Sequence, residues 1–131
     1  MYSLGVSDFV MIAHSLAGEF FGPAQRMHGA TLGVEVELRC AQLDPHGVVV
    51  DIGEMRQLLR SVLEPLDYQN LDDHPAFPPR GSTTERIAAH ICNSLARALT
   101  QALGAALPKD GVLRVLVRES PAAWVAFETR I

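Results

Sequence analysis

The chain has 131 residues, of which 48% are hydrophobic and 20% are charged. This is the composition of an ordinary globular protein, and the length predicts a single domain over residues 1–131. The net charge of −4 comes without a basic stripe, which argues against nucleic acid as a partner. No apolar stretch approaches the length of a membrane span, and no signal peptide is visible, so we expect a cytoplasmic protein that does not enter a membrane.

The first forty residues predict two strands. Residues 3–17 are apolar and β-branched with Asp8 as their only charge, a pattern typical of a buried strand. Four Gly and Pro residues between 18 and 29 indicate a loop. Residues 32–40 then alternate between apolar and polar side chains, which predicts a strand with one face toward solvent.

The middle of the chain predicts two helices. A turn at residues 44–47 is followed by a β-branched run, in which the strand is expected to resume. From Gly53 the apolar residues recur at spacings of three and four, which predicts a helix over residues 53–66 and a loop over 67–81. Ser82 and Glu85 form a capping box that predicts the start of a second helix, and Gly104 predicts its end.

Two short strands, 112–119 and 122–129, complete the pattern, joined tightly through Ser120 and Pro121. The order strand, strand, helix, helix, strand, strand predicts an α+β fold with both helices on one face of a four-stranded antiparallel sheet. The two open edges of such a sheet predict a homo-oligomer. Cys40 and Cys92 form no disulfide framework and are expected in the core.

Six segments covering nearly the whole chain resemble, in order and approximate spacing, the family of 6-pyruvoyl-tetrahydropterin and 6-carboxy-tetrahydropterin synthases. They are AHSL, HGATLGVEVEL, GVVVDIGEMRQLL, LDYQNLDD, STTERIAAHICNSL and VLVRESPAAWVAFE. The resemblance implies the tunnelling fold, or T-fold, in which the sheets of several subunits join into a barrel, typically in hexamers of two stacked trimers. It also implies a pterin substrate bound between subunits, and chemistry on dihydroneopterin triphosphate that uses zinc, a cysteine and an Asp–His pair.

The resemblance assigns roles to particular residues. His14 and His28 match zinc ligands, whereas the family's next zinc histidine falls on Ala30. The family's cysteine falls on Ala24, and its catalytic Asp–His pair falls on Asp67 and Tyr68. Three residues match those that anchor the pterin ring, namely Thr83, Thr84 and Glu119.

Each of these residues also has a plainer interpretation. Catalytic zinc normally takes three protein ligands, so His14 and His28 need a third donor or are partly buried polar residues without a metal. The available donors are Glu19, His46, Tyr68, His74 and His90, and no spacing selects one of them. Tyr68 can act as a replacement acid or base beside Asp67, or can merely fill the histidine's space.

The anchor residues have alternatives of the same kind. The Glu119 carboxylate can accept a pair of hydrogen bonds from the edge of a pterin or guanine-like ring, or can be a surface charge at a strand end. Thr83 and Thr84 can bind a ligand, cap the helix that follows, or do both.

The main hypothesis is therefore a synthase-like protein that keeps a pocket for a pterin-like or purine-like ring but has lost ordinary zinc-dependent synthase activity, because Ala24 cannot serve as the base that this chemistry needs. Two alternatives stay open. One is an active pterin lyase or aldolase-like enzyme that uses Tyr68 and Asp67 as acid and base. The other is a non-catalytic assembly or regulatory paralogue that combines with an active subunit.

Overall fold

The computed structural model describes residues 1–131, and its first two strands form a long antiparallel hairpin. β1 spans Tyr2–His14 and β2 spans His28–Cys40, paired one to one along their whole length. Alternate residues of both strands are buried, namely Val6, Val10, Ile12 and His14 in β1 and Leu32, Val34, Val36, Leu38 and Cys40 in β2. The hairpin therefore has one apolar face and one face left to polar side chains.

The strand limits differ from those predicted because loop contacts replace strand pairing. β1 ends before Ala17, since the amide of Leu16 donates to the carbonyl of Ala24 (3.0 Å) and that of Ala17 to the carbonyl of Arg80 (2.9 Å). β2 begins at His28 rather than at residue 32. Between them lies an arm with a short 3₁₀ segment, Glu19–Gln25, kinked at Gly22.

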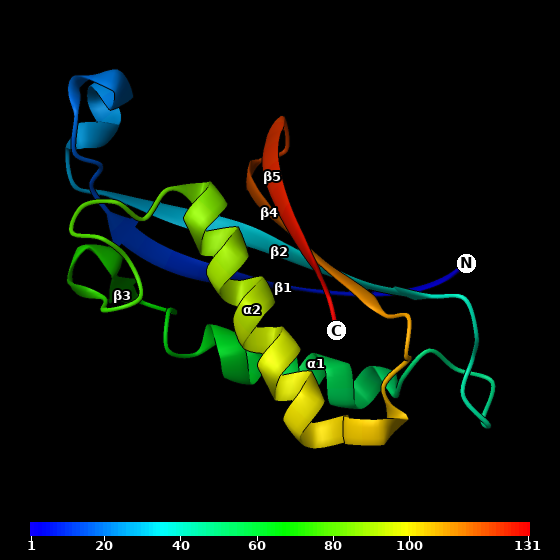
Figure 1. Ribbon diagram of the computed structural model, residues 1–131. Helices are drawn as coiled ribbons and strands as arrows, with labels where there is room; N and C mark the ends of the chain where they lie inside the picture. Colours follow the sequence, from blue (N-terminus) through cyan, green and yellow to red (C-terminus); the bar gives the residue numbers. More distant parts are fainter.

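Two helices cover the apolar face of the sheet, and they pack against each other as well as against the strands (Figure 1). α1 spans Ile52–Leu63 and α2 spans Thr84–Leu103. Both direct their apolar side chains inward, namely Met55, Leu59 and Leu63 of α1 and Ile87, Ala88, Ile91, Cys92, Leu95 and Leu99 of α2. α1 ends earlier than predicted, since Pro65 has no amide proton to continue it.

The prediction that a strand resumes at residues 48–52 is wrong. The carboxylate of Asp44 accepts hydrogen bonds from the amides of His46 and Val48 and holds this segment in a turn. Asp51 then caps α1 by accepting from the amide of Glu54 at 2.7 Å, so the helix has already begun at residue 52.

The last two strands, β4 (Val112–Ser120) and β5 (Ala123–Arg130), form the predicted C-terminal hairpin. β4 also pairs with β2, which gives the sheet order β3-β1-β2-β4-β5. The α+β architecture is confirmed, but the sheet has five strands and not four. The additional strand β3 is only Gln69–Asn70 and runs parallel to the end of β1. Two residues are too few for an alternating pattern, so the sequence could not reveal it.

The core lies between the sheet and the helices and includes both cysteines, which are free and buried as predicted. Burial raises the pKa of the Cys92 thiol to about 11, so this residue is an unreactive core group. None of the helices combines the length and apolar character that crossing a bilayer requires.

The opposite face of the sheet has no helix over it and is charged. Glu35 pairs with Arg118, and Arg39 pairs with Glu128 at 3.2 Å. β5 has no neighbour on its outer side, and β1 has one only at Ile12 and Ala13, where β3 lies. Both edges therefore carry backbone groups free to pair with another strand.

Candidate functional site

The predicted site residues gather at the end of the sheet where β1 ends, β2 begins and α2 starts. Figure 1 shows the start of α2 over this end, beside the loop that carries β3 and the arm between β1 and β2. His14 and His28 are paired across the two strands, and their rings meet edge to face with 4.6 Å between centroids. The antiparallel register alone brings together two histidines that are fourteen positions apart.

Both imidazoles are held through Nδ1. His14 Nδ1 lies 2.9 Å from the carbonyl oxygen of Ser82 and 3.0 Å from its hydroxyl, and His28 Nδ1 lies 2.8 Å from the carbonyl oxygen of Arg26. Because a carbonyl oxygen only accepts hydrogen bonds, Nδ1 carries the proton in each ring. Each Nε2 therefore keeps its lone pair when the ring is neutral. Histidines that bind metals are often held in the same way, with one ring nitrogen donating to a carbonyl and the other left as the ligand.

Burial favours the neutral form of His14. His14 is only 6% exposed, and desolvation lowers its pKa, with a further lowering from the neighbouring charge of His28. The carbonyl of Ser82 and the carboxylates of Asp72 and Glu119 act in the opposite direction without reversing the shift. A neutral imidazole in this position is an acceptor at Nε2 for a ligand or a metal.

The residues around the start of α2 connect the histidines to the end of β4. Ser82 contacts His14 and is fully buried, Thr83 caps the helix, and the hydroxyl of Thr84 donates to the Glu119 carboxylate. The capping box predicted at Ser82 and Glu85 is wrong by one residue, since Thr83 is the cap and accepts from the amide of Arg86. Ser82 is turned inward instead, to hydrogen-bond with His14.

Thr84 and Glu119 come together although they are 35 residues apart, because β4 brings Glu119 to the N-terminal end of α2. Glu119 is exposed, and the bond from Thr84 leaves a carboxylate oxygen free to accept from a ligand. The amide groups of the first helical turn point to the same region, and a helix N-terminus favours polar or anionic ligands.

The two histidines that the resemblance assigns to zinc have no third donor at position 30. Ala30 follows His28 by two residues on the same face of β2 and offers no donor. No group of three or more His, Cys, Asp or Glu side chains is arranged to hold a metal ion. His74 and His90 cluster with Phe77, with 5.9 Å between the two imidazole centroids, and His46 lies in the turn after β2. The residues present do not complete a three-ligand zinc site.

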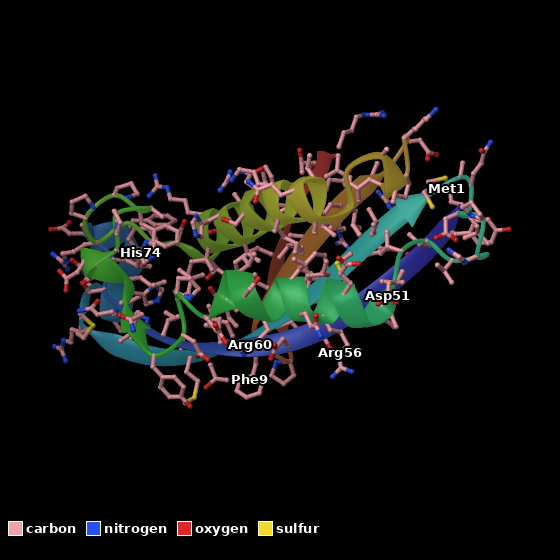
Figure 2. All side chains as sticks on the ribbon, turned by 90° about the horizontal axis from the view of Figure 1, so that it is seen from below. Met1, Phe9, Asp51, Arg56, Arg60 and His74 are labelled. Carbon is pink, nitrogen blue, oxygen red and sulfur yellow. The ribbon has the colours of Figure 1, made fainter.

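Asp67 and Tyr68 lie together at the β1 edge, but the Asp67 side chain is hydrogen-bonded and the Tyr68 side chain is exposed. The Asp67 carboxylate accepts from the amide of Met11 (2.9 Å) and from the guanidinium of Arg60 (3.0 Å), which also reaches Asp8. Figure 2 shows Arg60 on the side of α1 next to Phe9, where it makes these contacts. Tyr68 is 76% exposed with a positive φ of 57°. Asp67 thus fastens α1 to β1, while the Tyr68 ring projects into solvent.

The sequence alone did not indicate Ser82, Asp72 or Arg80 as parts of this end of the molecule. The sequence pattern indicates only a capping role for Ser82, although a small polar residue just before a cap can also form a hydrogen bond to the interior. Asp72 and Arg80 lie in a proline-rich loop, where charged residues are ordinarily solvated. Their hydrogen bonds to Ser15 depend on the packing of three separate segments.

Solved structures of similar shape define the class of protein. The 6-pyruvoyl tetrahydropterin synthase of Caenorhabditis elegans superposes with a TM-score of 0.79 at 23% identity, covering 98% of this chain and 95% of that one. The 6-pyruvoyltetrahydropterin synthase of Plasmodium vivax gives a TM-score of 0.79 at 21% identity, covering 99% and 98%. At such identities the likeness shows the fold, and the chain is a T-fold protein.

Sequence comparison narrows this class to a family. The family model described as 6-pyruvoyl tetrahydropterin synthase matches residues 4–130. The 6-pyruvoyl tetrahydrobiopterin synthase of Poecilia reticulata is 38% identical over 79 residues (58% of this chain, 53% of that protein). The human protein of that name is 33% identical over 75 residues (55% and 51%). The chain spans about half the length of the curated relatives it matches. It belongs to the 6-pyruvoyl tetrahydropterin synthase family.

Proposed function

We propose that this chain binds a small molecule with a pterin-like or purine-like ring at the start of α2, without ordinary zinc-dependent synthase activity. The observation that carries the binding part is the hydrogen bond from Thr84 to Glu119, which keeps a carboxylate beside the helix N-terminus. Family membership supports the class of ligand, since the relatives named above are pterin synthases.

The chemistry of such a ring suits the groups present. A pterin or guanine edge carries a ring N–H beside an exocyclic amine, and one carboxylate can accept from both. Glu119 has this role in the proposal, and Thr83 and Thr84 add the polar groups of the first helical turn. The free Nε2 atoms of His14 and His28 are acceptors for hydroxyl or amine groups further along the ligand.

The proposed loss of synthase activity rests on residue types. The family's chemistry needs zinc and a base of suitable pKa near the substrate. Ala24 and Ala30 stand where the resemblance expects a cysteine and a zinc histidine, and neither can supply a proton acceptor or a ligand. The alternative in which Asp67 and Tyr68 replace them is less favoured, because Asp67 is engaged by Arg60 and Met11.

We also propose a homo-oligomer, built from trimers and closing the sheets into a barrel, in which ligand sites lie near subunit boundaries. The unpaired outer side of β5 and the mostly unpaired edge of β1 support this proposal. Light scattering of the purified protein tests it: a monomer at micromolar concentration would contradict it.

Neopterin, a fluorescent pterin, tests the binding proposal. The wild-type chain is expected to bind it, and Glu119→Gln to bind it roughly tenfold to 100-fold more weakly, the cost of losing a charged hydrogen-bond acceptor. Glu128→Gln is the matched control, because Glu128 lies on β5 and pairs with Arg39. Equal binding by wild type and Glu119→Gln would contradict the assignment. An assay with dihydroneopterin triphosphate and added zinc tests the proposed loss of synthase activity. Turnover at the rate of an ordinary synthase would refute it.

A further inference from the structure

Asp72 and Arg80 connect three segments at this end of the molecule through their hydrogen bonds. The Asp72 carboxylate accepts from both the amide and the hydroxyl of Ser15, at 2.9 and 2.5 Å. The same hydroxyl accepts from Arg80 Nε at 2.9 Å, and another guanidinium nitrogen of Arg80 donates to the carbonyl of Gln25 at 2.8 Å. Ser15 thus bridges an acid and a base that make no direct ion pair.

Each of these contacts lies next to a histidine or its partner. Ser15 directly follows His14, and Arg80 precedes by two residues the Ser82 that binds the His14 ring. Gln25 precedes Arg26, whose carbonyl binds His28 Nδ1. The arginine side chain therefore connects the end of β1 to the arm before β2, while its main-chain carbonyl accepts from the amide of Ala17 at 2.9 Å.

The burial of Ser15 favours these hydrogen bonds in the folded chain. Ser15 is only 6% exposed, so breaking its bonds would leave buried polar atoms without partners. Burial acts to raise the pKa of Asp72, but the two bonds from Ser15, with smaller effects of His14 and Arg80, leave it lowered. Arg80 is an exposed residue with a positive φ of 52°, and its guanidinium nevertheless reaches inward to Ser15.

We propose that Asp72 and Arg80 are positioning residues for the ligand site: joined through Ser15, they hold His14 against Ser82 and fix the arm that leads to His28. They touch neither ring themselves and act through the segments that carry them. The ligand-binding part of this inference rests on the proposed function, whereas the placement of the His14 ring does not.

The test compares Asp72→Asn, Arg80→Ala and Arg80→Lys with the control Arg97→Ala, whose guanidinium contacts Ser94 on α2. Long-range ¹H–¹⁵N spectra of the histidine rings report the tautomer of His14, with His74 and His90 as internal controls. Wild type and Arg97→Ala are expected to show the proton on Nδ1. Asp72→Asn and Arg80→Ala are expected to show a mixture of tautomers at His14 alone, because the ring is no longer held to Ser82.

Neopterin affinity is the second readout, with a loss of at least about tenfold expected in the same two variants, the scale on which outer-shell partners act at binding sites. If wild type binds no neopterin, the proposed function fails, and the tautomer spectra still decide the positioning role. If Arg80→Ala or Asp72→Asn does not fold, Arg80→Lys decides. A lysine keeps the charge but offers one nitrogen in place of the two that bond Ser15 and Gln25, so a mixture of His14 tautomers is expected in this variant too. A folded variant with the His14 tautomer unchanged would overturn the inference.

Discussion

The rings of His14 and His28 meet edge to face, 4.6 Å between centroids, at paired positions of two antiparallel strands. Each ring is fixed by a main-chain carbonyl at Nδ1 and presents Nε2 to the space beside it. Ala30, on the same face of β2, leaves the position of a third donor empty. The two imidazoles would need a further donor to hold zinc in the usual three-ligand way.

Adding the missing imidazole should therefore create a zinc site. Ala30→His is expected to bind one zinc ion per chain at least about tenfold more tightly than wild type, since three ligands are the usual minimum for such a site. Isothermal titration with zinc measures this. Thr31→His is the matched control, because residue 31 faces the opposite side of β2. Stoichiometric, tight zinc binding by wild type would show that two histidines suffice.

Asp67 and Tyr68 should differ in their effect on stability. Asp67→Asn is expected to lower the free energy of unfolding by about 1–3 kcal/mol, because the Arg60 guanidinium loses one of its two carboxylate partners and the Met11 amide loses a strong acceptor. Tyr68→Phe is expected to change it by less than about 0.5 kcal/mol, since the ring is 76% exposed. Urea unfolding measures both. A large effect of Tyr68→Phe on neopterin binding would restore a role in the site for its hydroxyl.

The start of α2 gives a test of which residue is the cap. Thr83→Ala is expected to destabilise the protein by about 0.5–1 kcal/mol, the lower part of the usual range, because the bond to the Arg86 amide is long at 3.4 Å. Ser82→Ala is expected to leave the helix intact and to shift the ring N–H resonance of His14. Thermal unfolding and NMR separate the two effects. A loss of stability in Ser82→Ala, without one in Thr83→Ala, would show that Ser82 is the cap.

Stability should fall on mild acidification. Burial lowers the pKa of His90 in the folded chain below its ordinary value of 6.5, with additional lowering from His74 and Arg97. As the pH drops below 6.5, the unfolded chain binds a proton that folded His90 does not, so the free energy of unfolding decreases, by at most about 1.4 kcal/mol per pH unit for one group. His14 behaves in the same way.

Replacement of His90 should remove part of the pH dependence of stability. His90→Phe keeps a ring against Phe77 and is expected to reduce the slope of stability against pH between about 5 and 6.5, as measured by urea unfolding at several pH values. An identical slope in wild type and His90→Phe would mean that His90 titrates normally in the folded chain.

Patterns within single segments predicted much of this fold. Alternation along residues 32–40 and helical spacing from Gly53 to Leu63 depend only on which side chains must leave water, so the elements and their inner faces followed from the sequence. The wrong predictions fall where the hydrogen bonds of a few polar groups determine the local backbone conformation. The Asp44 turn replaced an expected strand, and one residue separates the predicted cap from the observed one.

The sequence by itself determined the element order, the apolar faces and the residue types at the site, including Ala24 and Ala30, because these are properties of the chain. Only the tertiary structure decided which groups meet: His14 with Ser82, Thr84 with Glu119, and Asp67 with Arg60. Such contacts join residues far apart in sequence, and strand register and helix packing create them. No local pattern records that an arginine in a proline-rich loop ends beside a serine 65 positions earlier.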